Sequence, residues 1–321
     1  MSPARDGGPA VVALGGGHGL AATLSALRRV THHLTGIVTV ADNGGSSGRL
    51  RTEFGILPPG DLRMALAALC GDDDWGRAWA EILQHRFGGD GPLAGHPVGN
   101  LLLAALWDME GDQVSGLDLV AELLGARGRV LPMANVPLDI EADVEFGSPE
   151  HVELVRGQVE VATTSGRILG VRLDPANPPA CPQAVAALDS AEWVTIGPGS
   201  WFTSVMPTLL VPQLRQALLR TPAKRALVLN LVGQPGETEH LSPAEHLEVL
   251  AAHAPDLHLD VVVADAHTTV DVPSLQHAAR ALGAELVMAD VRSSTRPDQH
   301  DPQALAEVFA TTFAPGSPTQ A

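Results

Sequence analysis

Three glycine-rich segments, each placed directly after an apolar stretch, are the residues of this chain most suited to chemistry. They are residues 15–19, 42–48 and 197–200. Glycines at such turns let the backbone approach a phosphate closely. A helix that begins there offers free N–H groups and the positive end of its dipole. Because the carboxyl ends of parallel strands meet at one edge of a sheet, we expect all three segments to border one crevice.

The first segment is similar to known phosphate-binding fingerprints without matching them. Gly15 and Gly17 have the spacing of the dinucleotide motif, but its third small residue would fall at position 20, which is Leu20. No Gly-Lys-Ser/Thr follows, so the Walker form is absent. The segment is either a ligand-binding loop or a tight turn without a ligand, and we favour the first interpretation.

The second segment combines an acid, an amide, glycines and hydroxyl groups. Ser46 and Ser47 are suited to donate to phosphate oxygens, and Arg49 and Arg51 follow directly. Asp42 stands about 20 residues past the first glycines, where a ribose-binding acid is expected. It is equally suited to hold Mg²⁺ through water. The alternative is a solvated Asn-Gly turn.

Further polar residues lie next to predicted helix starts. Asp61 either caps the following helix or takes part in the site, and Asn100 has the same two interpretations. Gly199 and Ser200 open a potential anion nest at a helix start. Asn230 lies near the end of the next predicted strand. These residues extend the expected crevice.

Composition narrows the class of protein. The chain has 321 residues and a formal net charge of −17, with 20 basic against 37 acidic residues, which argues against nonspecific binding of nucleic acid. Its two cysteines have no metal-site or disulfide spacing, and we expect no metal site and no catalytic Ser-His-Asp or cysteine nucleophile. No signal peptide and no apolar run of membrane-spanning length is found, so we expect a cytoplasmic protein without membrane insertion.

Alternating apolar and helical patterns predict the fold class. We expect an α/β protein with a Rossmann-like, mostly parallel sheet, helices on both faces and a small antiparallel β excursion at about residues 129–173. We expect flexible tails at residues 1–9 and 315–321 around one domain at 10–314. The predicted strands of the main sheet cover residues 10–14, 37–40, 193–196, 225–231, 259–263 and 285–288. The excursion contains predicted strands at 130–131, 138–144, 152–161 and 168–173.

Seven motifs together carry a resemblance to a known family. They are ALGGGHGL at 13–20, VTVADNGGSSGRLR at 38–51, PPGDLR at 58–63, LAGHPVGNLLLAAL at 93–106, RGRVLP at 127–132, IGPGSWFTSVMPTLLV at 196–211 and NLVGQPGET at 230–238. On these motifs the chain resembles the YvcK (GlmR) family of gluconeogenesis factors, within the CofD-like superfamily. The resemblance covers about residues 11–291.

The resemblance implies a ligand and a set of contact residues. The ligand is UDP-N-acetylglucosamine or a related UDP-sugar, with NAD as another occupant, and no cofactor is required. The implied contacts are Gly16, Gly17, His18, Gly19, Asp42, Asn43, Gly44, Gly45, Ser46, Ser47, Asp61, Asn100, Gly199, Ser200, Asn230 and, on a looser match, Arg292. His18 stands where the family usually has Thr, and Asn43 replaces a second Asp.

Two functions follow from the resemblance. The first is a regulatory protein that binds a nucleotide-sugar and supports gluconeogenic growth, envelope-precursor supply and cell shape, with an enzyme of amino-sugar metabolism as partner. The second is a CofD-like 2-phospho-L-lactate transferase acting on a deazaflavin acceptor, in which Asp42 and Asp61 would position Mg²⁺. The GGSSG sequence at 44–48 favours the first. A homo-oligomer is compatible with both.

Overall fold

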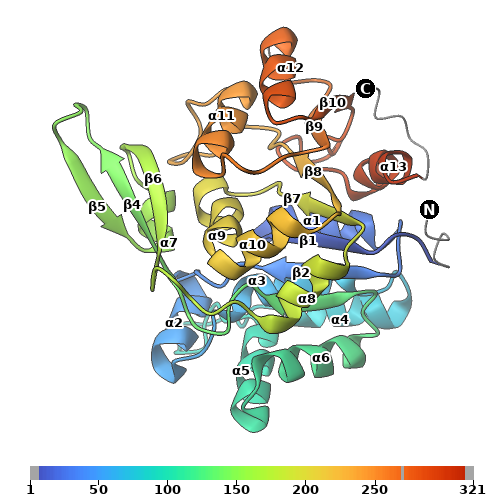
Figure 1. Cartoon of the computed structure of the whole chain (residues 1–321). Helices are drawn as coiled ribbons and strands as arrows, with labels where there is room; N and C mark the ends of the chain where they lie inside the picture. The colour runs from blue at the N-terminus through green and yellow to red at the C-terminus, as the bar shows by residue number, and fades with distance from the viewer. Residues whose placement is uncertain (1–6, 269–270, 315–321) are drawn as a thin grey trace.

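The computed structural model describes residues 7–268 and 271–314. Seven parallel strands form the main sheet in the order β10-β9-β8-β7-β1-β2-β3 (Figure 1). They are β1 (Val11–Gly15), β2 (Leu34–Val38), β3 (Arg129–Pro132), β7 (Trp193–Ile196), β8 (Lys224–Val228), β9 (Val261–Asp265) and β10 (Glu285–Ala289). The predicted fold class, a mostly parallel α/β sheet with a small antiparallel addition, is confirmed.

The strand order reverses beside β1. The chain first runs outward from β1 through β2 to β3, then returns to β7 on the other side of β1 and runs outward again to β10. Loops that follow the strands on either side of such a reversal diverge, and the crevice between them is where open α/β sheets bind ligands. The loops after β1 and β7 therefore border the expected crevice.

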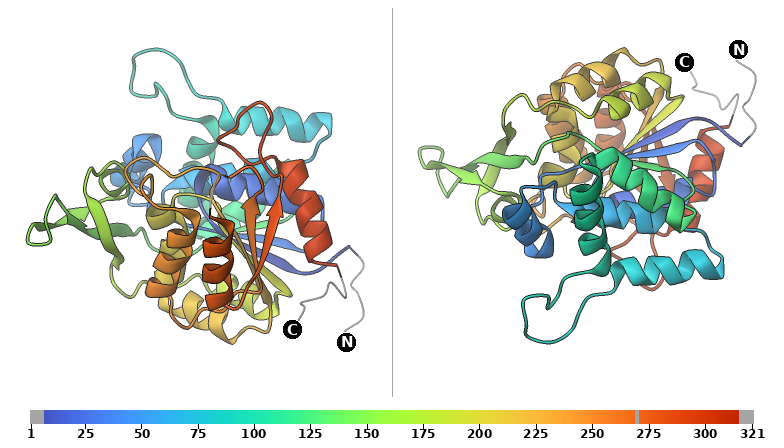
Figure 2. Two further views of the ribbon diagram at one scale, coloured as in Figure 1. Left: turned by 90° about the horizontal axis from the view of Figure 1, so that it is seen from above. Right: turned by 90° about the horizontal axis from the view of Figure 1, so that it is seen from below.

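Helices cover both faces of the sheet (Figures 1 and 2). Helix α1 packs against α3 and α13, whereas α8 packs against α10 and α11 against α12. The helices are α1 (Gly17–Leu27), α2 (Gly45–Phe54), α3 (Pro59–Leu69), α4 (Asp74–Gln84), α5 (Val98–Glu110), α6 (Gln113–Leu124), α7 (Gln158–Ala162), α8 (Pro182–Ser190), α9 (Met206–Leu210), α10 (Pro212–Arg220), α11 (Pro243–His253), α12 (Val272–Ala281) and α13 (Pro302–Thr312), with a π-helix η1 (Trp201–Val205).

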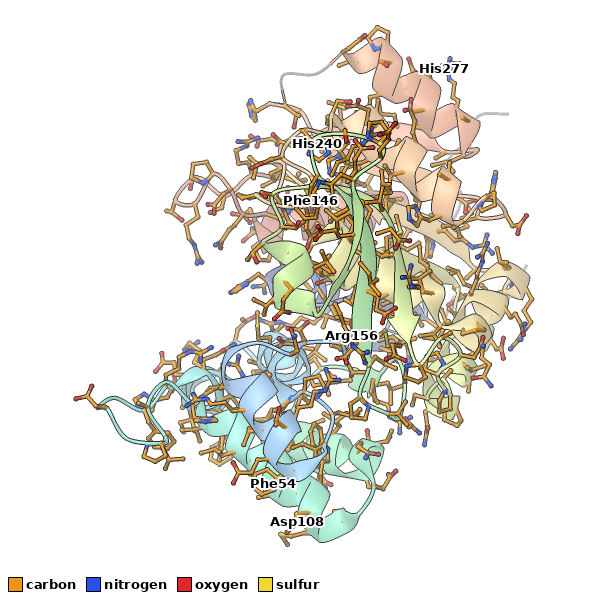
Figure 3. All side chains as sticks on the ribbon, turned by 90° about the vertical axis from the view of Figure 1, so that its left-hand side faces the viewer. Phe54, Asp108, Phe146, Arg156, His240 and His277 are labelled. Carbon is orange, nitrogen blue, oxygen red and sulfur yellow. The ribbon has the colours of Figure 1, made fainter. Side chains whose placement is uncertain are left out.

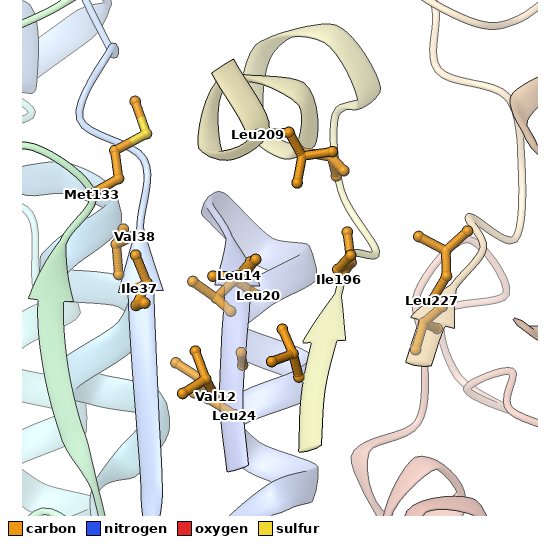
Figure 4. Packing of buried hydrophobic residues seen from close by; sticks show 14 of the residues in the cluster. Val12, Leu14, Leu20, Leu24, Ile37, Val38, Met133, Ile196, Leu209 and Leu227 are labelled. Atoms are coloured by element: carbon orange, nitrogen blue, oxygen red, sulfur yellow. The ribbon is translucent and has the colours of Figure 1, made fainter. Parts of the chain in front are cut away.

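Aliphatic side chains fill the space between the sheet and its helices (Figure 4). Leu14 and Val12 of β1 lie near Leu20 and Leu24 of α1, and Ile37 of β2 lies beside them. All five are 2% exposed or less. Burying each such side chain stabilises the fold by about 1.5–3 kcal/mol, so the loops after β1 and β2 are held on a rigid base.

The antiparallel addition is a three-stranded sheet in the order β5-β4-β6, formed by β4 (Asp139–Glu145), β5 (Val152–Arg156) and β6 (Arg167–Asp174). It projects from the main body, and Figure 3 shows it from the side with Arg156 labelled. Arg51 of α2 and Arg156 of β5 both bind Asp139, with N–O distances of 2.6 and 3.1 Å. The Arg51 ion pair fixes the small sheet against α2, and the Arg156 ion pair joins β5 to β4.

Several predicted elements differ from the structure. Residues 130–131 belong to β3 of the main sheet, where they pair with β2, and not to the excursion. The strand predicted at 152–161 ends at Arg156, because Gly157 at φ +110° turns the chain into α7. Helices α2, α8 and α9 and the π-helix η1 were not predicted, since their glycine, proline and polar content is typical of loops.

No described helix has both the length and the apolar character required to span a bilayer. The predicted tails at 1–9 and 315–321 lie largely outside the described residues.

The loops after β1 and β7 touch backbone to backbone. A Cβ atom added to Gly19 would lie 2.1 Å from the carbonyl oxygen of Pro198 and 2.8 Å from the Cα atom of Gly199. No larger residue fits there without moving one loop, because both contacts are with backbone. Glycine at position 19 is thus required by close approach.

We therefore predict that Gly19→Ala lowers the free energy of unfolding by about 1–3 kcal/mol, the usual cost of overpacking. Urea unfolding followed by circular dichroism measures it. Gly91→Ala is the control, because a Cβ atom there meets nothing within 4 Å. Equal stability of the two variants would contradict the close contact.

Candidate ligand-binding cleft

The three glycine-rich segments meet in a cavity of about 230 Å³, here called the acidic cavity. It lies beyond the carboxyl ends of β1, β2 and β7. Its lining residues are Gly16, Gly17, His18, Gly19, Thr39, Asp42, Asp61, Gln158, Gly199, Ser200, Thr203, Ser204 and Gln234. The predicted shared crevice is therefore present, with the second segment represented by Asp42 alone.

A second cavity, of about 450 Å³, adjoins the first and is here called the alanine-lined cavity. Its wall includes the alanines at 21, 22, 67, 68 and 80, together with Met64, Asn230, Arg296, Asp298 and His300. His18, Gly19, Gly199 and Gln234 line both cavities and form their shared rim. Together the two volumes are of the size that holds a small organic ligand, about 300–1,000 Å³.

Two carboxylates face the acidic cavity, Asp42 from the loop after β2 and Asp61 from the first turn of α3. Asp61 lies close to Gly16, since a Cβ atom on Gly16 would be 2.5 Å from Asp61 Oδ2 and 2.4 Å from Thr39 Cγ2. Asp42 accepts a hydrogen bond from the N–H of Gly44 at 2.8 Å. Burial, and then the charge of Asp42, raise the pKa of Asp61 to about 7, against an opposing hydrogen bond from the Gly17 N–H.

Most of the second segment lies outside both cavities. Ser46 and Ser47 are buried, and Ser46 Oγ accepts a hydrogen bond from Asn100 Nδ2 at 3.0 Å. Asn100 in turn accepts from Arg63 Nε at 2.9 Å. Gly44, Gly45, Ser46, Ser47 and Asn100 line neither cavity. Ser46 and Asn100, predicted as contacts, tie α2 to α3 and α5.

Asn43 also serves the architecture. Its amide accepts from the N–H of Val159 at 3.0 Å and donates to Glu160 at 2.9 Å. These bonds attach α7 to the second segment and bring Gln158, the first residue of α7, to the wall of the acidic cavity.

The third segment is not the open anion nest that its glycines predict. The N–H of Gly199 donates to Asn230 Oδ1 at 2.8 Å, and Asn230 Nδ2 donates back to the Gly199 carbonyl at 2.9 Å. The buried carboxylate of Glu237 accepts from the N–H of Phe202 at 2.9 Å and from Thr203 Oγ1 at 2.5 Å. An internal carboxylate thus occupies the amino end of η1. Trp201 and Phe202 are buried in the core.

Arg292 is likewise engaged within the protein. Its guanidinium donates to Asp265, a buried residue at the end of β9, at 2.8 and 3.2 Å. It lines neither cavity, whereas Arg296 lines the alanine-lined one.

Three buried polar atoms of the cleft have no hydrogen-bond partner in the protein. They are Thr39 Oγ1, Gln234 Oε1 and His300 Nε2. Thr39 and Gln234 line the acidic cavity, and His300 lines the alanine-lined one. Burial lowers the pKa of His300 to about 4, so its imidazole is neutral at pH 7. Buried polar groups are nearly always satisfied, so these atoms point to a polar ligand or water in the cleft.

Sequence reasoning did not select five residues of the site. Thr39, Gln158, Thr203, Ser204 and Gln234 line the acidic cavity. Thr203, Ser204 and Gln234 follow predicted strands within a few residues, so their position was a usable signal. Gln158 had none, because it reaches the cleft only through the packing of α7.

The arrangement of His, Cys, Asp and Glu side chains limits the kind of metal site that the protein can form. Among residues 7–268 and 271–314, no group of three or more His, Cys, Asp or Glu side chains is placed to hold a metal ion.

Another cavity, of about 510 Å³, lies beside α13 near Trp193 and Lys224, the first residues of β7 and β8. It is at the opposite edge of the sheet and contains none of the glycine-rich segments.

The raised pKa of Asp61 predicts a pH-dependent stability. The folded state keeps this proton up to about pH 7, whereas the unfolded chain loses it near its ordinary value of 3.8. Stability is therefore highest below about pH 4 for this group and is lost as pH rises through 7. Relative to the parent, Asp61→Asn should gain on the order of 1–3 kcal/mol between pH 5 and 8. Urea unfolding at several pH values tests this, with Asp298→Asn as matched control. Parallel profiles for the parent and Asp61→Asn would refute it.

Removal of Glu237 should destabilise the loop that it holds. We predict that Glu237→Ala costs about 2–4 kcal/mol, because it leaves two buried donors unpaired, and that Glu237→Gln costs about 1 kcal/mol. Chemical unfolding measures both, and Glu239→Ala at the exposed neighbouring position is the control. If the alanine and glutamine variants of Glu237 were equally stable, its bonds to η1 would not matter.

Comparison with known proteins agrees with this architecture. A family model described as "2-phospho-L-lactate transferase CofD" matches residues 11–306. A solved structure from Bacillus halodurans, a member of the UPF0052 family, superposes with a TM-score of 0.83 at 31% identity, covering 93% of this chain and 97% of that one.

Relatives with similar sequences share one name. A protein of Mycobacterium tuberculosis described as "Putative gluconeogenesis factor" is 56% identical over 307 residues, which is 93% of this chain and 89% of the relative. The "Gluconeogenesis factor" of Bacillus subtilis is 37% identical over 265 residues, covering 83% and 80%. The chain therefore belongs to the CofD family and, within it, to the gluconeogenesis factors of the YvcK type.

Proposed function

We propose that the protein binds a nucleotide-sugar of the UDP-N-acetylglucosamine kind in the two joined cavities and acts in the cytoplasm as a regulator. The observation that carries the proposal is that the two cavities join. An acidic cavity and an alanine-lined cavity meet at Gly19 and Gly199, at the reversal of the strand order. One end of such a ligand is flat and partly apolar, and the other is a ring of hydroxyl groups.

The unpartnered atoms support a ligand with several hydrogen-bonding groups. Thr39 Oγ1 and Gln234 Oε1 border one cavity and His300 Nε2 the other, so a single extended molecule would satisfy all three. Thr203 already donates a hydrogen bond to Glu237, and the Gly199 N–H already donates to Asn230. Because these groups are engaged within the protein, they suit a binding role better than a catalytic one. The name shared by the relatives supports a role in gluconeogenic growth. We extend it to envelope-precursor supply and cell shape, through a partner enzyme of amino-sugar metabolism.

Isothermal titration with UDP-N-acetylglucosamine is the direct test, with NAD as competitor. We expect Ala22→Leu, which fills the alanine-lined cavity, to weaken binding at least tenfold without loss of fold. Ala78→Leu is the matched control, since it adds the same side chain at an exposed helix position outside both cavities. Absence of heat and of a thermal shift at millimolar ligand would refute the proposal.

A second candidate is a 2-phospho-L-lactate transferase, favoured by the description of the matching family model. Asp42 and Asp61 are then the residues that would hold Mg²⁺, and two carboxylates suffice because this ion keeps several waters and binds substrate phosphates. The ion would supply neutralisation of phosphate charge. Incubation with guanylylated phospholactate, a deazaflavin acceptor and Mg²⁺ tests it, with an authentic transferase as positive control. Absence of product would exclude this candidate.

A further inference from the structure

The acidic cavity differs from a phosphate site in its charge. Asp42 and Asp61 line it, and the lining includes no Lys or Arg. The carboxylate of Glu237 lies directly behind Thr203, which adds negative charge to the same wall. A bare phosphate inside this cavity would face Asp42 and the ionised fraction of Asp61 with no basic side chain to balance them, and like charges repel at short range.

Several hydrogen-bonding groups of the cavity are placed to accept. Thr203 donates its single hydroxyl proton to Glu237, so toward the cavity its oxygen offers only lone pairs. Gln234 Oε1 is an unpartnered acceptor, and carboxylates accept whenever they are ionised. Thr39 is 3% exposed and its Oγ1 has no partner. This set suits a ligand group rich in O–H donors and free of charge.

The features that suit phosphate lie at the shared rim and beyond it. Helix α1 begins at Gly17, whose N–H donates to Asp61, and the next two residues of its first turn, His18 and Gly19, border both cavities. Arg296 supplies a guanidinium on the wall of the alanine-lined cavity. A helix amino end and an arginine are common partners of phosphate groups.

Size agrees with this division. The acidic cavity, at about 230 Å³, is below the range for a whole drug-sized ligand, so it suits only part of one. We propose that the acidic cavity is the subsite for an uncharged, polyhydroxylated group, the sugar end of the ligand, held by Asp42, Asp61 and Thr39. The diphosphate then lies at the rim beside His18 and Gly19, and the nucleoside in the alanine-lined cavity. The inference rests on the proposed function and specifies its orientation.

Titration calorimetry with UDP-N-acetylglucosamine and with UDP, each with and without Mg²⁺, tests the orientation. The parent protein should bind the sugar nucleotide at least tenfold more tightly than UDP, without a requirement for Mg²⁺. Asp42→Asn and Asp61→Asn should reduce that difference to threefold or less and leave the affinity for UDP unchanged or higher. Asn at position 42 retains an oxygen for the Gly44 N–H, so the loop is preserved.

The control and the contrary results separate the two proposals. Asp90→Asn removes an exposed carboxylate outside both cavities and should keep the full difference between the two ligands. Equal affinity of the parent for UDP and the sugar nucleotide would overturn the subsite while leaving nucleotide binding intact. UDP binding that requires Mg²⁺ and is lost in Asp42→Asn would also overturn the subsite, because Asp42 and Asp61 would then hold a metal ion bound to the diphosphate. Failure of both ligands to bind the parent would overturn the proposed function and the subsite together.

Discussion

The contact between the loop after β1 and the loop after β7 is the constraint on which the rest of the structure depends. Gly19 lies against the backbone of Pro198, at the point where the strand order reverses between β1 and β7. The two loops separate the cleft into two cavities and provide their shared rim. Buried aliphatic side chains beneath β1 and α1 keep the rim in place.

Charge then differentiates the two cavities. The acidic cavity collects Asp42 and Asp61, and Glu237 stands behind its wall, bound to the amino end of η1. The alanine-lined cavity has a small-residue wall, a guanidinium from Arg296 and a neutral imidazole from His300. An elongated ligand with chemically distinct ends fits this pairing better than a symmetrical one. The net negative charge of the chain is thus compatible with an anionic ligand, because the phosphates of that ligand need not enter the acidic cavity.

Much of this could be predicted from the sequence, for identifiable reasons. Residues 15–19 and 197–200 follow continuous apolar strands, so the rule for parallel sheets correctly places them at one edge. Ser46 and Asn100 illustrate the limit. Their types suit phosphate binding, yet both are buried in bonds that join helices, and only packing decides which way such a residue faces. Glu237 and Gln158 act through tertiary contacts across long chain separations, which local patterns do not contain. The seven motifs correctly identified the family, whereas their glycines alone overstated the number of open anion nests.

The most direct test of the central claim is a crystal structure of the protein with UDP-N-acetylglucosamine bound. We expect density that spans the rim at Gly19 and Gly199, with the sugar hydroxyls within hydrogen-bonding distance of Asp42 and Asp61 and the uracil among the alanines of α1 and α3. Ligand bound in the cavity beside α13, or with its diphosphate between the two carboxylates, would contradict it.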